Sequence, residues 1–422
     1  MVTTKVGMFV WNYFTNDARV LREGTALSEA GYHVDLIAIH QTGLPKVEQQ
    51  NVNFHVYRMS RKLPFTPILS WFKNKKYLLG ILVLLYIIAC FYWPLLFLLL
   101  LTLLFFTKPM RTIMFRSVVF FRMVGAGFRQ RYDIYHANDL NTLLQAVICA
   151  KWLGRSKLIY DSHEVQTSRT GYDSPLYGIM ERFLLRFVDV CIHENHTRAA
   201  YVEERYGFYP EVVHNYPFKQ EQDAEMTVDL HQQLEIPREE PILLYQGGIQ
   251  AGRGLDRLIE AAPNIKMGTI VLIGDGRIKP TLKKMVVERN LETRVKFMDK
   301  VALEALPSHT KEAYLGFQIL NNTCFNHYSA SSNKLFEYIM SGVPVIACDF
   351  PEISRVVKGY EVGLTVNSHD SEAIAKAVNE LVSNPEKRKK LHQNCLEARD
   401  VFNWEQEKLI FLALYEKIVI RS

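Results

Sequence analysis

Two segments in the second half of the chain combine glycines with positive charge at a predicted strand-to-helix junction. The first is Tyr-Gln-Gly-Gly-Ile-Gln-Ala-Gly-Arg-Gly-Leu-Asp at 245–256. Gly247 and Gly248 let the backbone approach a ligand closely, and Arg253 stands where a guanidinium can grip two phosphate oxygens together. A glycine-rich turn with a solvated arginine would look the same, so this segment alone leaves both interpretations open.

The second segment, Ser-Ala-Ser-Ser-Asn-Lys-Leu-Phe-Glu-Tyr-Ile-Met-Ser-Gly-Val-Pro at 329–344, predicts a capped helix start beside a cation. One of residues 331–333 would cap a helix whose exposed N–H groups favour an anion, and Lys334 adds a positive charge there. Glu337 shares a helix face with Asn333 and Lys334, so its carboxylate could accept hydrogen bonds from a ribose diol. The alternative is a surface Lys–Glu pair of little energetic value.

Three further polar loops follow predicted strands, where ligands bind in parallel sheets. Two are His-Ala-Asn-Asp at 136–139 and Asp-Ser-His-Glu at 161–164. Their side chains with candidate roles are His136, Asn138, Asp139, His163 and Glu164. A single histidine at a strand end is often structural, but two such quartets at equivalent places favour function. The third loop, with Gly274 and Asp275, predicts a tight turn beside the ligand.

Apolar strand-like and helix-like segments alternate along the chain, which predicts α/β architecture with parallel sheets covered by helices. The 422 residues exceed what one hydrophobic core usually serves. We expect two doubly wound domains facing a cleft: residues 1–217, and residues 218–403 after a polar linker at about 218–240. A final amphipathic helix at 404–422 completes the chain.

Residues 77–106 carry no charged side chain and interrupt the first domain. Their length suffices to cross a bilayer once. However, the predicted strands on either side belong to one sheet, and basic residues flank both ends, so both ends prefer the cytoplasm. Pro94 permits a bend. We therefore expect a re-entrant helical hairpin that anchors the chain without crossing, and rank it above a true span and above a buried core segment.

The overall composition excludes several classes of protein. The net charge of +6 arises partly from basic clusters beside the apolar run, which favour an anionic membrane surface as partner. The chain lacks zinc-finger spacing and arginine-rich tails, so nucleic acid is not an expected partner. The six cysteines are scattered without a Cys-x-x-Cys, which disfavours a disulfide framework or a zinc site. No signal-peptide pattern is seen, so a cytoplasmic catalytic body is expected.

Taken in order, these segments resemble glycosyltransferase family 4, whose members are retaining, metal-independent enzymes of the GT-B fold. The resemblance spans nearly the whole chain except the apolar insert. It rests on the ordered set Asn-Asp-Ala-Arg-Val-Leu-Arg-Glu (16–23), Ala-Gly-Tyr-His-Val (30–34), Tyr-Asp-Ile-Tyr-His-Ala-Asn-Asp (132–139), Asp-Ser-His-Glu (161–164), Gly-Gly with Arg-Gly (247–254), Ile-Gly-Asp-Gly (273–276), and Asn-Lys-Leu-Phe-Glu-Tyr with Gly-Val-Pro-Val-Ile-Ala (333–347).

The resemblance implies roles for these residues. Arg253 and Lys334 would hold the donor diphosphate and stabilise charge on the departing nucleotide, while Glu337 would bind the ribose. The first domain, around His136 and Asp139, would hold the acceptor. No metal or other cofactor is expected, because no Asp-x-Asp motif is evident.

Two positions depart from the family pattern. Ser329 stands where many members have a donor-sugar glutamate, with seven residues separating it from Glu337. Asn138 stands where many have a second histidine. These departures leave the sugar in question and support an alternative interpretation, a catalytically impaired membrane scaffold that binds nucleotide sugar or a partner transferase.

The sequence-based hypothesis is therefore a retaining transferase at the cytoplasmic face of the cell membrane. It would move a sugar from a nucleotide-diphosphate donor to a lipid-linked saccharide in polysaccharide or glycolipid synthesis. A sugar-nucleotide epimerase on the same fold is a third possibility, although it would need no anchor. The sequence leaves the sugar, the base, the linkage and the oligomeric state open.

Overall fold

The computed structural model describes residues 4–15, 17–62, 76–89, 95–96, 107–168, 174–219, 228–302 and 304–420. It divides into two compact units. The first comprises residues 1–161 and 181–191, and the second comprises residues 162–180 and 192–422. Each unit is built around the strands of a predominantly parallel sheet, in agreement with the α/β class predicted from the alternating pattern.

In the described part of the chain, the first sheet has eight strands in the order β3-β4-β2-β1-β5-β6-β7-β8. β1 lies centrally and pairs in parallel with β2 on one side and β5 on the other, with Val6 opposite both Val34 and Ile134. The strands are β1 (Lys5–Phe9), β2 (His33–Ile39), β3 (Val47–Asn51), β4 (Phe54–Met59), β5 (Ile134–Asn138), β6 (Lys157–Ser162), β7 (Val190–His193) and β8 (Glu211–Val212). Central strands buried on both faces read as continuous apolar runs, which is why β1, β2 and β5 were evident from sequence.

The helices of this half follow from local signals of varying strength. α1 (Ala18–Glu29) begins at Asp17, whose carboxylate accepts a hydrogen bond from the Val20 amide. Asn16, the first residue of the 16–23 segment quoted above, lies outside the described residues. The other helices are α6 (Leu140–Val147), continued by a π-helical turn (Ile148–Trp152), α7 (Pro175–Leu184) and α8 (His196–Tyr206).

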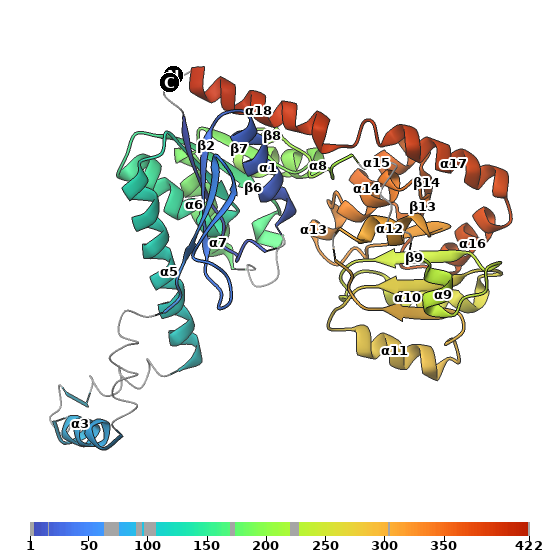
Figure 1. Ribbon diagram of the computed structural model, residues 1–422, viewed down its shortest axis with the longest axis horizontal. Coiled ribbons are helices and arrows are strands. Elements are labelled where there is room, and N and C mark those ends of the chain that lie inside the picture. Colours follow the sequence, from blue (N-terminus) through green and yellow to red (C-terminus); the bar gives the residue numbers. More distant parts are fainter. Residues whose placement is uncertain are drawn as a thin grey trace. The chain divides into compact units, whose positions relative to one another are not determined.

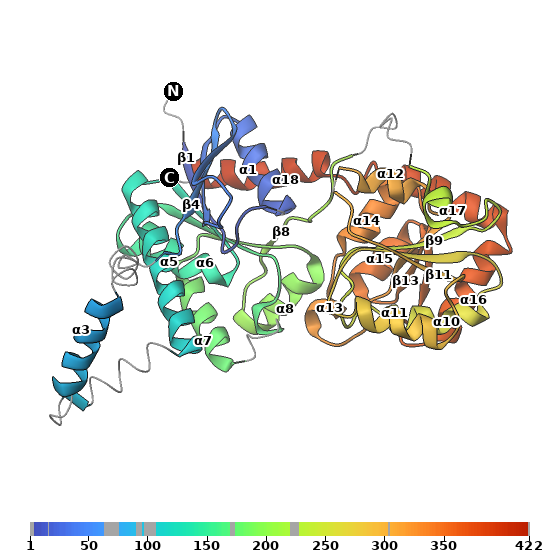
Figure 2. The ribbon, with the colours of Figure 1, turned by 60° about the horizontal axis from the view of Figure 1, so that its bottom comes forward.

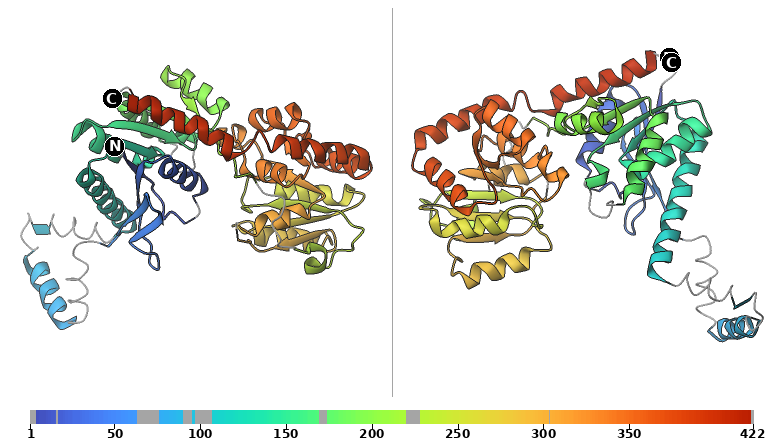
Figure 3. Two further views of the ribbon diagram at one scale, coloured as in Figure 1. Left: turned by 45° about the horizontal axis from the view of Figure 1, so that its top comes forward. Right: turned by 180° about the vertical axis from the view of Figure 1, so that it is seen from behind.

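Two elements of the first half were not predicted. β3 is a polar edge strand, antiparallel to β4, and its exposed face carries no apolar signal. α5 (Lys108–Gln130) is a helix of 23 residues that packs against β2, β4 and α6, as Figures 1 and 3 show. Its buried side is only the narrow stripe of Val119, Met123 and Gly127, so the interspersed arginines hid its periodicity.

The apolar insert is described only in part. α3 (Lys76–Ala89) is a helix of 14 residues, and residues 90–94 and 97–106, which include Pro94 and half of the expected hairpin, lie outside the described residues. Large apolar side chains are exposed along α3, namely Ile81, Val83, Leu84, Leu85, Ile87 and Ile88. Among the described residues, no helix combines the length and the apolarity needed to cross a membrane.

The second sheet has six described strands, all parallel, in the order β11-β10-β9-β12-β13-β14. They are β9 (Ile242–Gln246), β10 (Thr269–Ile273), β11 (Val295–Met298), β12 (Leu315–Gln318), β13 (Val345–Cys348) and β14 (Gly363–Val366). One apolar core joins this sheet to α10 (Leu255–Ala261), α11 (Lys279–Glu288) and α16 (Ser371–Val382). A second core joins its other face to α9 (Leu230–Leu234), α14 (Asn333–Met340) and α15 (Pro351–Gly359). Figure 2 shows α10 and α11 on one side of the sheet and α14 on the other.

The stretch expected to be a polar linker is partly structured. It contains α9, whose Leu230 is fully buried, and the nearby Ile236 joins the same core. Two features concealed these residues in the sequence. The surrounding residues are highly charged, and a helix of five residues is too short to show a periodic pattern. The remaining helices are α12 (Leu306–Lys311), α13 (Phe325–Tyr328), α17 (Pro385–Ala398) and α18 (Trp404–Ile420).

Candidate active site

The amino terminus of α14 presents a buried lysine beside uncapped backbone amides. Ser332 occupies the cap position, yet its side chain makes no capping hydrogen bond. Lys334 is 9% exposed, and its Nζ lies 3.2 Å from the Tyr245 hydroxyl and 4.3 Å from the centre of that ring. The aromatic face thus supports an ammonium group at a helix start, where positive charge and free N–H groups together favour an anion.

Burial makes this lysine easy to deprotonate. Burial and, after it, the nearby positive charge of Arg253 lower the pKa of Lys334 to about 7, against the opposing effects of Glu337 and Cys348. An ammonium that is held without a paired anion in a poorly solvated place loses the solvation that it has in water. A bound diphosphate would supply the missing negative charge.

Arg253 lies in the same neighbourhood. Burial is the main cause of the lowered pKa of the His327 imidazole, and the charge of Arg253 also lowers it. Burial raises the pKa of the Tyr245 hydroxyl, and the charge of Arg253 opposes that rise. The arginine immediately precedes Gly254, which begins α10 with φ +68° and leaves no room for a side chain, since a Cβ would stand 2.6 Å from the Ile319 carbonyl oxygen. The turn therefore holds Arg253 at the end of the β9 loop, half buried and near Lys334.

Glu337 is oriented by a buried amide. Gln246, the last residue of β9, donates from Nε2 to Glu337 Oε2 at 2.7 Å. Thr310 of α12 in turn donates to Gln246 Oε1 at 2.8 Å. Gln246 has no exposed surface, so this chain of hydrogen bonds fixes one carboxylate oxygen of Glu337 and leaves the group partly exposed.

These groups line one cavity of about 340 Å³. Seven of the eight residues predicted to bind the donor contribute to its wall: Gly247, Gly248, Gly274, Asp275, Asn333, Lys334 and Glu337. The eighth, Arg253, is not among the lining residues, although its charge acts on Lys334. The structure thus brings together, from two loops and helix α14, the residues that the spacing singled out.

Two loops of the cavity wall are in close contact through glycine. Gly274 has φ +149°, and a Cβ there would stand 1.9 Å from the carbonyl oxygen of Gly247. Asp275, next along the loop, accepts from Lys279 Nζ at 2.9 Å, and this hydrogen bond is the main cause of the lowered pKa of its carboxyl. Asp275 is therefore engaged with Lys279 at the cavity edge.

In the first unit, His136, which was predicted on the acceptor side, belongs to a buried ion cluster. Arg19 of α1 forms two hydrogen bonds of 2.8 Å with the Asp161 carboxylate and lies 3.0 Å from Glu23. His136 Nε2 is 3.9 Å from carboxylate oxygens of both Glu23 and Asp161. Two carboxylates and an imidazole could ligate a metal ion, but the guanidinium already neutralises Asp161. His136 has no exposed surface, so it contacts the charge cluster rather than solvent in this conformation.

The end of β5 carries the other two predicted residues. Asn138 is buried and donates from Nδ2 to the Phe9 carbonyl oxygen at 3.0 Å, which ties β5 to β1. Asp139 has φ +63° and ψ 163°, a backbone conformation that costs a non-glycine residue on the order of 1–3 kcal/mol and is concentrated at functional sites. Its side chain does not cap α6.

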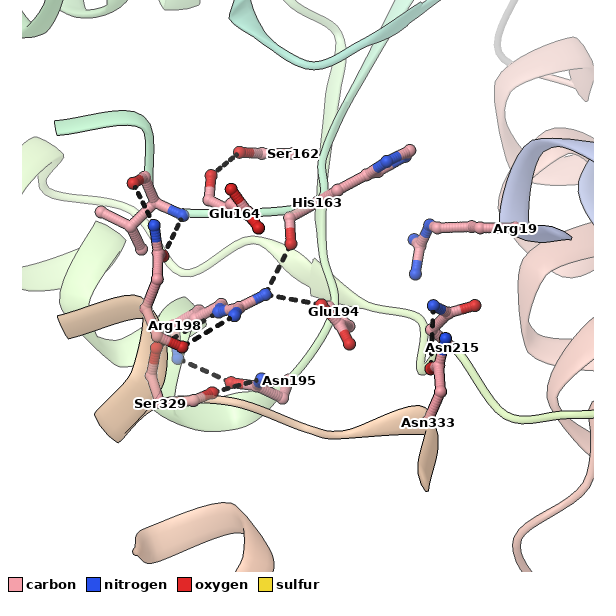
Figure 4. A network of polar contacts seen from close by, with 12 residues as sticks. Arg19, Ser162, His163, Glu164, Glu194, Asn195, Arg198, Asn215, Ser329 and Asn333 are labelled. Atoms are coloured by element: carbon pink, nitrogen blue, oxygen red, sulfur yellow. Dashed lines mark hydrogen bonds and ion pairs between the residues drawn. The ribbon is translucent and has the colours of Figure 1, made fainter. Parts of the chain in front are cut away.

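Ser329, the serine at the position of the family glutamate, is fully buried against Arg198 (Figure 4). Arg198 donates from Nε to Ser329 Oγ at 3.2 Å and from Nη1 to Glu194 Oε2 at 2.5 Å. The same Nη1 donates to the carbonyl oxygen of His163 at 2.5 Å. The hydroxyl thus belongs to a network in which Glu194 supplies the carboxylate. Of the predicted acceptor-side pair, His163 joins this network through its backbone, and the Glu164 carbonyl oxygen accepts from Ser162 Oγ at 2.9 Å.

Several functional-site residues were missed from sequence. Gln246 was quoted within the glycine segment but given no role, although a polar residue that ends a buried apolar strand was an available signal. Lys300 and Val301, which follow β11, and Leu306, the first residue of α12, also line the cavity, and no recognisable motif marks them. Arg19 and Glu23, four residues apart on α1, offered a helical pairing signal, but only the fold shows that Asp161 meets them.

Known proteins provide an independent comparison. Residues 227–397 match the family model described as glycosyl transferases group 1. This match covers less than half of the chain. The matched residues include all the elements from β9 to α14 that line the cavity.

Three similar proteins extend the comparison. An alpha-D-kanosaminyltransferase of Streptomyces kanamyceticus is 28% identical over 158 residues, which are 36% of this chain and 39% of that protein. Sucrose-phosphate synthase of Thermosynechococcus elongatus has a TM-score of 0.76 at 18% identity, over 99% of this chain and all of that one. Anabaena Alr3699/HepE in complex with UDP and glucose has a TM-score of 0.71 at 15% identity, over 98% of this chain and all of that one.

The structural likenesses show that the chain has the GT-B fold, and the domain match relates it to the GT-B glycosyltransferases. The chain spans less than half the length of the first curated relatives it matches, between 39% and 48% of each.

Proposed function

We propose that this GT-B glycosyltransferase transfers a sugar from a nucleotide-diphosphate donor, with retention of configuration, to a saccharide acceptor at a membrane. The observation that carries the proposal is the gathering of Lys334, Glu337 and the glycine loops around one cavity, with the charge of Arg253 close by. The complex of HepE with UDP and glucose is consistent with such a donor.

The proposed chemistry follows from the charges. Departure of a nucleoside diphosphate concentrates negative charge on its terminal phosphate, and preorganised positive groups stabilise that charge more in the transition state than in the ground state. Arg253, Lys334 and the uncapped amides of α14 supply these groups without a metal ion or other cofactor. Glu337, held by Gln246, would accept hydrogen bonds from the ribose hydroxyls.

The acceptor part of the proposal rests on the first unit. α3 exposes a run of large apolar side chains, and α5 carries Lys108, Arg111, Arg116, Arg122 and Arg129. Apolar surface beside basic residues suits insertion at an anionic leaflet. We therefore propose docking at the cytoplasmic face of the cell membrane and a lipid-linked saccharide as acceptor, with His136 and Asp139 on the acceptor side.

A donor screen that measures release of nucleoside diphosphate tests the donor chemistry. With the donor that is turned over, Arg253→Ala and Lys334→Ala should each lower turnover by about a hundredfold or more, because each removes one charge-stabilising group. Arg257→Ala is the matched control, since Arg257 lies four residues further on, is partly exposed and pairs with Glu260 at 2.6 Å. Wild-type rates in both test variants would remove these residues from the mechanism.

Radiolabelled nucleotide sugars incubated with membrane extract distinguish the alternatives. Label in the lipid phase supports transfer, whereas a chemically altered free donor indicates an epimerase. Neither product, together with retained nucleotide binding, indicates a scaffold.

A further inference from the structure

Two histidines and an aspartate gather on one face of the first sheet, near the amino-terminal ends of β2 and β4. His33 and Asp35 are two residues apart on β2, and side chains two apart along a strand point to the same face. His55 of β4 lies directly opposite Asp35 in the parallel pairing. Strand geometry alone therefore places all three side chains together.

The ligand atoms lie at distances close to those of a metal site. His33 Nε2 is 3.4 Å from Asp35 Oδ1, and His55 Nδ1 is 3.9 Å from the same oxygen. All three atoms are within 4.8 Å of one another. Around a tetrahedral zinc ion with bonds of about 2.0–2.2 Å, ligand atoms stand roughly 3.3–3.5 Å apart. Small side-chain rotations would close the difference.

The aspartate has an unsatisfied oxygen that points to a missing partner. Asp35 is 3% exposed, and within the described part of the chain neither its Oδ1 nor His55 Nδ1 has a hydrogen-bond partner. The other oxygen, Oδ2, accepts from the Tyr132 hydroxyl at 2.8 Å. A buried carboxylate oxygen without a donor is costly. A hydrogen bond to the other oxygen is the usual way in which a ligating carboxylate is oriented.

No fixed cation fills this role. Among the described residues, the ion-pair partners of Asp35 are the two imidazoles, without a lysine or arginine. His33 and His55 have side chains 35% and 22% exposed, so an ion could enter from solvent and keep a water as its fourth ligand. The alternative is that one imidazole becomes protonated and pairs with Asp35.

We propose that His33, Asp35 and His55 bind a divalent transition-metal ion, for which zinc is the best chemical match. Two imidazole nitrogens and one carboxylate oxygen form a ligand set that suits zinc and disfavours calcium or magnesium, which prefer oxygen ligands. The site would clamp β2 to β4. It is separate from the sugar-transfer chemistry, because it lies near the amino-terminal ends of the strands, whereas Asp139 follows the carboxyl end of β5.

Zinc titration of the full chain tests the proposal, using protein without a histidine tag. Isothermal titration calorimetry should show one zinc ion bound per chain, and Co²⁺ should give the absorption bands of a four-coordinate site. His33→Gln and His55→Gln should each weaken zinc affinity by about tenfold or more, and the double variant should lose the site, because each removes a ligand. His369→Gln, at an exposed histidine outside the group, should bind as the wild type does.

The thermal unfolding temperature gives a second measurement. Zinc at saturation should raise it for the wild type and His369→Gln, but not for the double variant, since an ion that binds only the folded state stabilises that state. Unchanged unfolding of the metal-free double variant would show that it still folds. Stoichiometric zinc binding that survives in this variant, or an absence of saturable binding in the wild type, would overturn the proposal in favour of the protonated-imidazole pair.

Discussion

Lys334 combines a cost to folding with a proposed role in donor binding. Below a pH of about 7 the folded and unfolded states both carry its proton, and the burial cost is fully present. As pH rises from about 7 towards the ordinary lysine pKa of 10.5, the folded state is neutral while the unfolded state still holds the proton. The contribution of this group to stability therefore increases across that range. A buried cation that destabilises the ligand-free protein is expected at a site that binds a negatively charged ligand.

This lysine predicts proton uptake on donor binding. At pH 8 Lys334 is mostly neutral in the free protein, and a bound diphosphate should restore its charge, so binding should take up about one proton per nucleotide. Calorimetry in two buffers of different ionisation enthalpy measures this number, and affinity should fall as pH rises above about 7. Lys334→Met, which cannot be protonated, should lose the uptake and unfold at a higher temperature near pH 7. Identical uptake in wild type and variant would contradict the assignment.

Ser329 stands where many members of the resembled family have a glutamate, and the network around it shows how the neighbouring side chains accommodate the serine. Arg198 gives the serine hydroxyl a donor and pairs with Glu194, so the position is satisfied without a carboxylate of its own. A buried hydroxyl with a hydrogen-bond partner costs little. The departure from the family pattern is therefore accommodated structurally, and Ser329 is no evidence of a damaged fold.

Among the elements, the loops after β9 and β10 determine the shape of the donor cavity. Gly247 donates its amide to the Ile273 carbonyl oxygen at 2.9 Å, and the backbone of Gly274 lies against Gly247. The two loops are thus joined by a hydrogen bond and packed backbone against backbone, with no room for a side chain at the contact. This rigidity preorganises the cavity wall without ligand.

Gly274→Ala should therefore destabilise the second unit and weaken donor binding. Its Cβ would overlap the Gly247 carbonyl oxygen, and φ +149° is strained for any side chain, so a loss of about 2 kcal/mol or more is expected in urea unfolding. Gly359→Ala, at a helical position with nothing within 4 Å, is the control and should be neutral or slightly stabilising. Equal midpoints for the two variants would show that the loops relax at little cost.

α5 illustrates how an element can serve packing and surface charge together. Its buried stripe includes Gly127, where a Cβ would stand 2.6 Å from the ring of Phe9. Its outer side carries arginines together with the exposed Ile113 and Phe121. The helix is therefore fixed to the sheet through this stripe and keeps basic and apolar side chains exposed on its outer side.

For the whole molecule, the net charge of +6 and the apolar insert both favour the proposed binding to an anionic membrane. Basic side chains attract an anionic surface at a range of about a Debye length, roughly 8 Å at physiological salt. Apolar side chains then add a contact that salt does not screen. Binding to anionic vesicles should thus weaken with salt but persist in part.

Replacing residues 77–106 by a short flexible linker tests the anchor. The truncated protein should keep nucleotide affinity, because the donor cavity lies wholly in the second unit. It should lose most of its binding to anionic vesicles in a flotation assay and turn over a native lipid-linked acceptor more slowly, while a water-soluble acceptor analogue should be used as before. Undiminished turnover of the native lipid by the truncated protein would count against the anchored acceptor.

The sequence by itself determined the class of fold and singled out most of the residues that line the cavity. Strands buried on both faces must be apolar throughout, so β1, β10 and most other strands were evident within a residue or two. Gly247, Lys334 and Glu337 were recognisable because the features that mark them are local. Close approach of the backbone to a ligand, the cap of a helix start and the spacing along a helix face can each be recognised in a short segment.

Only the tertiary structure decided the contacts between distant residues. It placed Gln246 on Glu337, 91 residues away, and Arg198 on Ser329, 131 residues away. It also paired His55 with Asp35 and gave the amphipathic helix α5 its buried stripe. Such contacts depend on strand order and register. Many weak packing interactions together determine that order and register, and no short segment of the chain contains this information.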